Sequence, residues 1–150
     1  MGGAIVRARR ADIEVVTAGT HVIEGMPMSW RTRDALAGLE VTADGHRSRQ
    51  LRESDLDTAD LVLAMAGEHV AYVRRVHPSA AGRTATLKRL VRDLAPGPEP
   101  LGSRLGALGL NAVSIEEWED VDDPAGGDLP QFEACAREID DLLLELLPSL

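Results

Sequence analysis

The sequence has a single cysteine, Cys135, among its 150 residues. One thiol excludes a disulfide framework and any metal site built from several thiolates. The longest apolar stretch is the broken run at Leu142–Leu147, far shorter than the roughly 20 residues of a membrane-spanning helix. No positively charged start precedes an apolar signal core. We therefore expect a soluble, cytoplasmic protein with no membrane partner.

Acidic residues outnumber basic ones, 25 to 16, and the formal net charge is −9. Because nucleic-acid binding depends on neutralising phosphates with Lys and Arg, we expect no nucleic-acid partner. Residues 96–150 hold 13 acidic and two basic side chains. This acidic end has two readings, a solvated surface and a docking surface for a basic partner. The four histidines are scattered, so the sequence predicts no metal site, and nothing in it predicts a cofactor.

The composition, 44% hydrophobic and 27% charged, fits one compact domain over residues 1–150. Apolar runs predict parallel strands at Ile13–Val16, Asp60–Met65 and Arg83–Leu87. Helical patterns follow at Trp30–Leu39 with Ser29 as N-cap, Glu68–Val76, Lys88–Leu94 and Phe132–Leu146. Strands separated by helices indicate βαβ units. The predicted fold is α/β, a parallel sheet with helices on both faces.

In such a sheet, ligands bind beyond the carboxyl ends of the strands. We therefore expect the binding or catalytic residues in three loops. They lie at Thr17–His21, at Met65–His69 and, later in the chain, at Val121–Asp128.

Five motifs occur in a fixed order along the chain. They are Val16-Thr-Ala-Gly-Thr20, Gly25-Met-Pro27, His46-Arg-Ser-Arg-Gln-Leu51, Ala59-Asp-Leu-Val-Leu-Ala-Met65, and Asp123-Pro-Ala-Gly-Gly127 followed by Phe132. In order and spacing they resemble the low-molecular-weight protein tyrosine phosphatases. The resemblance implies a three-layer domain around a four-stranded, flavodoxin-like parallel sheet. It also implies hydrolysis of phosphotyrosine through a phosphocysteine.

The family's phosphate loop, Cys-x5-Arg, is absent from this sequence. The segment Met1–Arg10 resembles the helix that follows that loop, so the first central strand is missing as well. Cys135 is no substitute, because Asp141 stands six residues later and Cys135 lies on the apolar stripe of the last helix. The domain is therefore expected to be inactive as given, with the catalytic Cys and Arg absent from this chain.

The resemblance assigns three site residues. Asp123 matches the general acid, which protonates the leaving phenolate and then deprotonates the attacking water. Thr17 matches a serine whose hydroxyl supports the phosphate loop, and His46 matches a histidine near that loop. Each has a structural reading: Asp123 before proline starts a turn, Thr17 ends a strand, and His46 is a hydrogen-bonded structural residue. Asp122 competes with Asp123 for the acid role.

Three hypotheses follow for function. The chain is an incomplete version of a phosphatase, a pseudo-phosphatase that binds or regulates, or an enzyme of another class that uses Asp123 as an acid or base. A completed phosphatase would act on a phosphorylated protein or a small aryl phosphate.

The resemblance implies the family's strand order, in which the missing strand lies between Ile13–Val16 and Leu61–Met65, so we expect its absence to open the sheet. We expect one of three responses. The neighbouring strands pair with each other, a second copy or partner chain inserts a strand, or Met1–Arg10 rearranges to fill the slot.

Overall fold

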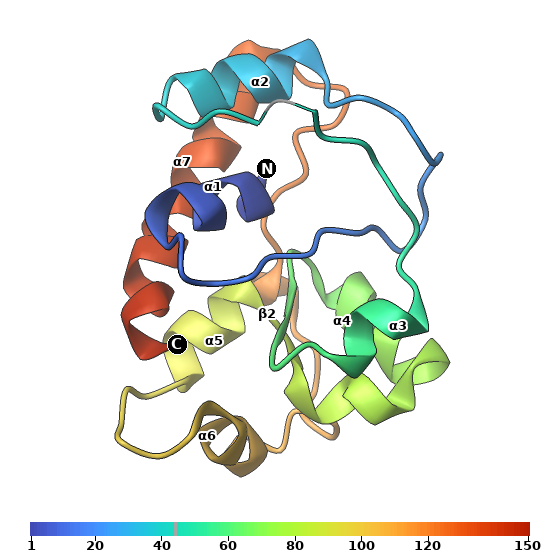
Figure 1. The fold of residues 1–150 in the computed structure, drawn as a ribbon, viewed down its shortest axis with the longest axis vertical. Coiled ribbons are helices and arrows are strands. Elements are labelled where there is room, and N and C mark those ends of the chain that lie inside the picture. Colours follow the sequence, from blue (N-terminus) through green and yellow to red (C-terminus); the bar gives the residue numbers. More distant parts are fainter. Residues whose placement is uncertain (44) are drawn as a thin grey trace. The chain divides into compact units, whose positions relative to one another are not determined.

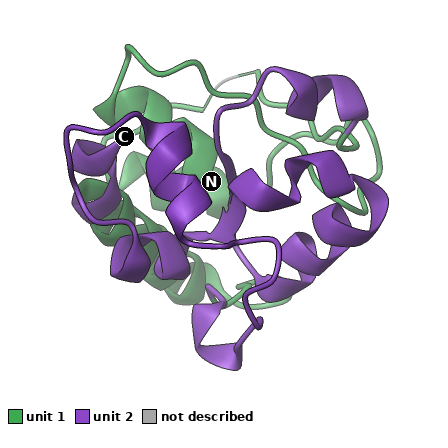
Figure 2. Ribbon diagram, turned by 90° about the horizontal axis from the view of Figure 1, so that it is seen from below, with its two compact units in different colours: residues 1–51, 122–144 green, residues 52–121, 145–150 purple. Residues whose placement is uncertain are grey.

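The computed structural model describes residues 1–43 and 45–150. They form two compact units, each assembled from segments far apart in the sequence (Figure 2). Unit 1 comprises Met1–Leu51 with Asp122–Leu144, and unit 2 comprises Arg52–Val121 with Glu145–Leu150. The single domain over residues 1–150 stays a prediction. Within the described ranges, no helix has both the length and the apolar character needed to cross a membrane.

Three helices build unit 1 (Figure 1): α1 (Gly2–Arg9), α2 (Trp30–Ala37) and most of α7 (Leu129–Leu146). The Ser29 side chain accepts a hydrogen bond from the Thr32 N–H at 3.1 Å, which confirms the predicted N-cap of α2. A small apolar core joins the helices, with Met1 and Leu39 packed against Ala35, Phe132 and Ala136.

An ion pair also ties α1 to α7. Arg9 Nε donates to Asp140 Oδ1 at 2.9 Å, and Arg9 Nη2 donates to Asp140 Oδ2 at 2.8 Å. The predicted apolar stripe of the last helix is confirmed. Six of its seven members are buried, namely Phe132, Cys135, Ala136, Ile139, Leu143 and Leu146, and Leu142 is partly buried.

The strand expected at Ile13–Val16 does not form, and this prediction is wrong. The Val15 carbonyl accepts a hydrogen bond from Arg7 Nη2 at 2.6 Å, so a side chain takes the place of a strand neighbour. The nearest strand-like pairing is an isolated parallel bridge from Gly19 to Gln50. Rearrangement of Met1–Arg10 into the slot is wrong as well, because Ala4–Val6 lies within α1.

Unit 2 contains the sheet, whose strands are β1 (Val62–Ala64) and β2 (Thr84–Thr86). They pair in parallel with Leu63 opposite Ala85, which confirms two predicted strands in shorter form. The helices are α3 (Glu53–Asp57), α4 (Gly67–Val76), α5 (Leu87–Asp93) and α6 (Leu101–Ala107), with 3₁₀ turns at Pro78–Arg83, Glu117–Glu119 and Leu147–Ser149. The α/β class is thus confirmed, although sequence patterns missed α3 and α6.

A buried ion pair closes the carboxyl end of β2. Glu119 is 2% exposed and Arg89 is 7% exposed. Both carboxylate oxygens of Glu119 bind the Arg89 guanidinium, with Arg89 Nε at 2.8 Å from Oε2. Thr86 Oγ1, at the last residue of β2, donates to the same Oε2 at 2.8 Å. The chain between Glu116 and Glu119 is therefore held against β2 by charge as well as by packing.

The next two residues are fixed to the carboxyl end of β1. Asp120 Oδ1 accepts a 2.6 Å hydrogen bond from the N–H of Gly67, the first residue of α4, where helix donors have no partner within the helix. The Val121 N–H donates to the Met65 carbonyl at 2.8 Å. Asp123 follows two residues later along the chain.

Candidate functional site

The start of α1 is built for close approach of the backbone. Gly2 and Gly3 form its first turn, and the N-cap residue Met1 makes no side-chain capping bond. A β-carbon on Gly3 would overlap with the Thr17 methyl group. Glycine at this position therefore lets Thr17 pack directly on the helix. The Thr17 hydroxyl has no hydrogen-bond partner within the described part of the chain, so it is free to support a further segment.

His46 is the second residue that the resemblance selects, and it is partly buried. Burial is the main cause that lowers its pKa, followed by the positive charges of the Met1 amino group, Arg7 and Arg47. The imidazole is consequently neutral near pH 7. Because the histidine is neutral, the arginines near it carry the positive charge of this region.

Asp123 lies on an exposed turn of unit 1. Its Oδ1 accepts a hydrogen bond from the Ala125 N–H at 2.9 Å, which is the arrangement of an Asx turn. Gly127 N–H donates to the Pro124 carbonyl at 2.9 Å, and Gly126 takes a positive φ of 84°. The turn-forming role that the sequence offers for Asp123 is therefore present. This turn occupies one carboxylate oxygen, Oδ1.

Cys135 is buried in α7, as the sequence indicates. Burial raises the pKa of its thiol, and the negative charges of Glu138, Asp123 and Asp122 raise it further. A thiol in this environment stays protonated at neutral pH and is a poor nucleophile. The expectation that Cys135 is structural agrees with this setting.

Within unit 1, Thr17 lies beside Gly3 in the first turn of α1, and the charge of the Met1 amino group contributes to the lowered pKa of His46. The charge of Asp123 contributes to the raised pKa of Cys135. Sequence reasoning missed the contribution of Gly3. The pair Gly2-Gly3 at the first turn of a helix was the available signal, because glycine is unfavourable there without a packing reason.

A pH titration tests the setting of His46. We expect its imidazole to titrate below its ordinary pKa of 6.5 in the folded chain. As the pH falls below 6.5, the unfolded chain takes up a proton that the folded chain resists, so the free energy of unfolding decreases. NMR titration of the histidine resonances measures the midpoint, with the chain in concentrated urea as the control. A folded midpoint at or above 6.5 would contradict this description.

The chain is similar to known phosphatases over much of its length. The model of the low molecular weight phosphotyrosine protein phosphatase family matches residues 4–97. The low molecular weight protein-tyrosine-phosphatase Etp of Escherichia coli (strain K12) is 32% identical over 84 residues, 56% of this chain and 57% of that protein. The chain thus spans little more than half the length of this relative. Thr17 and His46 lie inside the family match, whereas Asp123 lies outside it.

Two further relatives extend over more of the chain. The protein-arginine-phosphatase of Geobacillus stearothermophilus is 29% identical over 138 residues, which cover 92% of this chain and 77% of that protein. The crystal structure of the low molecular weight protein tyrosine phosphatase from T. tengcongensis superposes with a TM-score of 0.78 and 28% identity. That superposition covers 99% of this chain and 88% of the other.

The parallel strands and the helices define an α/β protein. The family match covers more than half of the sequence. This chain belongs to the low molecular weight phosphotyrosine protein phosphatase family.

Proposed function

We propose that this chain carries the acid and the scaffold of a phosphatase that hydrolyses phosphotyrosine through a phosphocysteine once a Cys-x5-Arg loop is joined to it. The observation that supports this proposal most directly is the state of Cys135. It is the only thiol in the sequence, it is buried, and its pKa is raised. The 150 residues by themselves therefore offer no thiolate for attack on phosphorus, and we propose that they are inactive as given.

In the completed site, a thiolate attacks the phosphorus and the P–O bond to the aryl group breaks. Asp123 gives its proton to the departing oxygen. The resulting carboxylate then removes a proton from water, whose oxygen attacks the phosphorus and releases the thiolate. Thr17 donates its hydroxyl hydrogen to the loop that carries the nucleophile, and His46 lies close to that loop. The free N–H groups at the start of α1 face the anionic phosphate.

We propose that the substrate is a phosphorylated protein or an aryl phosphate. Relatives of this chain are named for phosphotyrosine and for phosphoarginine in proteins. Both are phosphoryl groups on a protein side chain. Assays with both substrates distinguish them.

The second candidate is a pseudo-phosphatase that binds or regulates. The burial of Cys135, the single thiol of the 150 residues, favours it. This alternative predicts that the chain as given binds a phosphotyrosine peptide without turning it over, whereas the first proposal predicts turnover after the loop is joined.

Both proposals include a further strand that pairs with β1. Among the described residues, β1 has β2 as its one strand neighbour. We propose that its other edge pairs with a strand from a joined segment, a partner chain or a second copy, because an unpaired strand edge readily accepts another strand.

The activity of the chain as given is the first test. We expect hydrolysis of p-nitrophenyl phosphate or of a phosphoarginine peptide no faster than with an unrelated control protein, because the chain offers no thiolate that can form a covalent phosphoenzyme. Release of nitrophenolate or phosphate measures the rate. Turnover that disappears in Cys135→Ser would make Cys135 the nucleophile. Turnover that survives in the variant would assign the reaction to another group.

A further inference from the structure

Two consecutive residues, Asp120 and Val121, are anchored just beyond the carboxyl ends of β1 and β2. The Asp120 carboxylate accepts a hydrogen bond from the Gly67 N–H at 2.6 Å, at the start of α4. The Asp120 carbonyl accepts a hydrogen bond from Lys88 Nζ at 2.6 Å, and Lys88 lies in the first turn of α5. The Val121 N–H donates to the Met65 carbonyl at 2.8 Å. This short segment is therefore bound to the chain that follows each strand.

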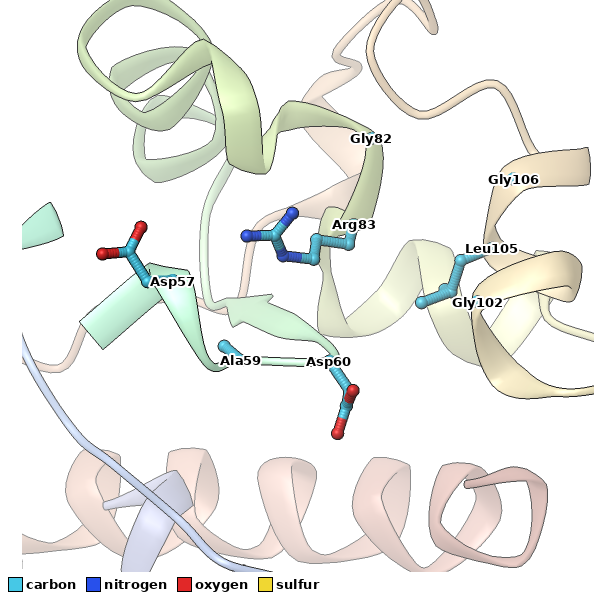
Figure 3. A pocket seen from close by; sticks show the side chains of 8 residues that line it. All are labelled: Asp57, Ala59, Asp60, Gly82, Arg83, Gly102, Leu105 and Gly106. Atoms are coloured by element: carbon cyan, nitrogen blue, oxygen red, sulfur yellow. The ribbon is translucent and has the colours of Figure 1, made fainter. Parts of the chain in front are cut away.

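A pocket marks the opposite, amino ends of the two strands. It has a volume of about 450 Å³, and Asp57, Asp60 and Arg83 are among the residues that line it (Figure 3). Parallel sheets of this class bind their ligands at the carboxyl ends of the strands. The anchored segment is thus at the end of the sheet where chemistry is expected, and no step of the proposed reaction uses the pocket.

Gly67 makes the bond to the Asp120 carboxylate possible. A β-carbon at Gly67 would overlap with the Ile115 side chain and would lie 3.5 Å from Asp120 Oδ1. The N–H of the first residue of a helix has no partner within the helix, and the helix dipole favours a negative charge there. The resulting hydrogen bond is charge-assisted and requires a side-chain acceptor at position 120.

The anchored residues restrict where Asp123 can lie. Only Asp122 separates Val121 from Asp123, so the α-carbons of Val121 and Asp123 are at most about 7 Å apart. Pro124 limits the backbone of Asp123 to extended conformations. On the far side of the proline, the Ala125 N–H donates to the Asp123 carboxylate at 2.9 Å. The freedom of Asp123 therefore depends on how firmly Val121 is held.

We propose that Asp120 is a positioning residue for the general acid Asp123 and that it acts through its hydrogen bond to the Gly67 N–H. This inference rests on the proposed function, in which Asp123 protonates the departing oxygen. The other two anchoring bonds are made by main-chain atoms of Asp120 and Val121, so the carboxylate is the one contact that a substitution at position 120 removes. Its loss lets the segment move, and a misplacement of about 1 Å can cost a catalytic group up to about 10²-fold in rate.

NMR of the full chain as given is the first test. In Asp120→Ala, faster amide exchange at Gly67 reports the loss of the bond, and we expect a lower backbone order parameter at Asp123. Asp120→Asn should keep both values, because its amide oxygen can accept the same N–H bond. Glu117→Ala is the matched control, since it removes an exposed carboxylate from the same stretch of chain and should change neither value. An unchanged order parameter at Asp123, with Gly67 exchange increased, would overturn the proposal.

Kinetics of a chain joined to a strand and a Cys-x5-Arg loop is the second test. The value of kcat/KM covers the step in which the aryl–oxygen bond breaks, and a basic leaving group needs the acid most. Asp120→Ala should lower kcat/KM about tenfold or more for phenyl phosphate and less than about twofold for 2,4-dinitrophenyl phosphate, whose leaving group needs no proton. Asp120→Asn should restore the rate with phenyl phosphate.

Equal losses with the two substrates would overturn the proposal, because a general loss of folded protein lowers both rates alike. Unchanged rates with both substrates would also overturn it. The proposed function fails by different results, namely an inactive joined chain or an unchanged rate in Asp123→Asn. In that case the order parameters of the chain as given still decide whether Asp120 holds Asp123 in place, since they do not depend on activity.

Discussion

Replacing Asp123 with asparagine in a chain joined to a strand and a Cys-x5-Arg loop should lower kcat for p-nitrophenyl phosphate by about 10²–10⁴, the usual effect of losing a general acid. The unaltered joined chain should be active, because the added segment provides the thiolate and the arginine. The segment of the T. tengcongensis relative is a suitable donor, since that structure superposes over 99% of this chain. Steady-state kinetics over a range of pH measures the effect.

Asp122→Asn is the matched control for this experiment. It removes the neighbouring carboxylate, which is also exposed, while Asp123 keeps its place directly before Pro124. We expect little change in kcat for this variant. An unchanged rate in Asp123→Asn would remove Asp123 from the mechanism, and a large loss confined to Asp122→Asn would transfer the acid role to that residue. The joined segment should also raise the thermal midpoint by pairing with β1.

Glu119→Gln should lower the free energy of unfolding by about 3–5 kcal/mol, because it leaves the buried guanidinium of Arg89 without its counter-charge. The carboxylate also accepts hydrogen bonds from Thr86 Oγ1 and the Glu116 N–H, each at 2.8 Å. Urea denaturation measures the loss. Glu117→Gln is the control, since Glu117 is an exposed neighbour in the same 3₁₀ turn, and a change within about 0.5 kcal/mol is expected there.

The same ion pair predicts a dependence on pH. Burial on its own would raise the pKa of Glu119, but the hydrogen bonds from Arg89, the Glu116 N–H and Thr86 outweigh it, and the net pKa lies below the ordinary 4.5. The stabilisation from this residue is therefore present above pH 4.5 and is lost as the pH falls through the folded-state value. A double variant, Arg89→Met with Glu119→Leu, should recover much of the stability, because it removes both buried charges. Equal stability of Glu119→Gln and the unaltered chain would show that the pair contributes nothing.

The helices show which features of the fold can be predicted from residues close together in the sequence. Ser29 capped α2 as expected, and His77-Pro78 ended α4 at Val76, because capping and proline act over a few residues. The short α3 and α6 were missed, since five and seven residues carry too little periodicity to stand out. Strands were harder to predict from the sequence. The run at Ile13–Val16 has the composition of a strand, but a strand also needs a neighbour, and composition does not supply one.

The candidate site, too, could be predicted from the sequence only in part. The order of five motifs selected Thr17, His46 and Asp123, and their roles stay predictions that the experiments above address. The overlap between a β-carbon on Gly3 and Thr17, and the positive charges of the Met1 amino group and Arg7 near His46, depend on segments 14 and more residues apart.

The sequence by itself determined the α/β class, the family motifs, the lack of Cys-x5-Arg and the apolar stripe that buries Cys135. These follow from residue order and from periodicities of two to four residues. Only the tertiary structure decided that Glu119 is buried with Arg89, that Asp120 caps α4, and that Asp57 and Asp60 share a pocket with Arg83. The physical reason is that burial and ion pairing depend on distances through space, and the chain brings those groups together from segments that no local pattern connects.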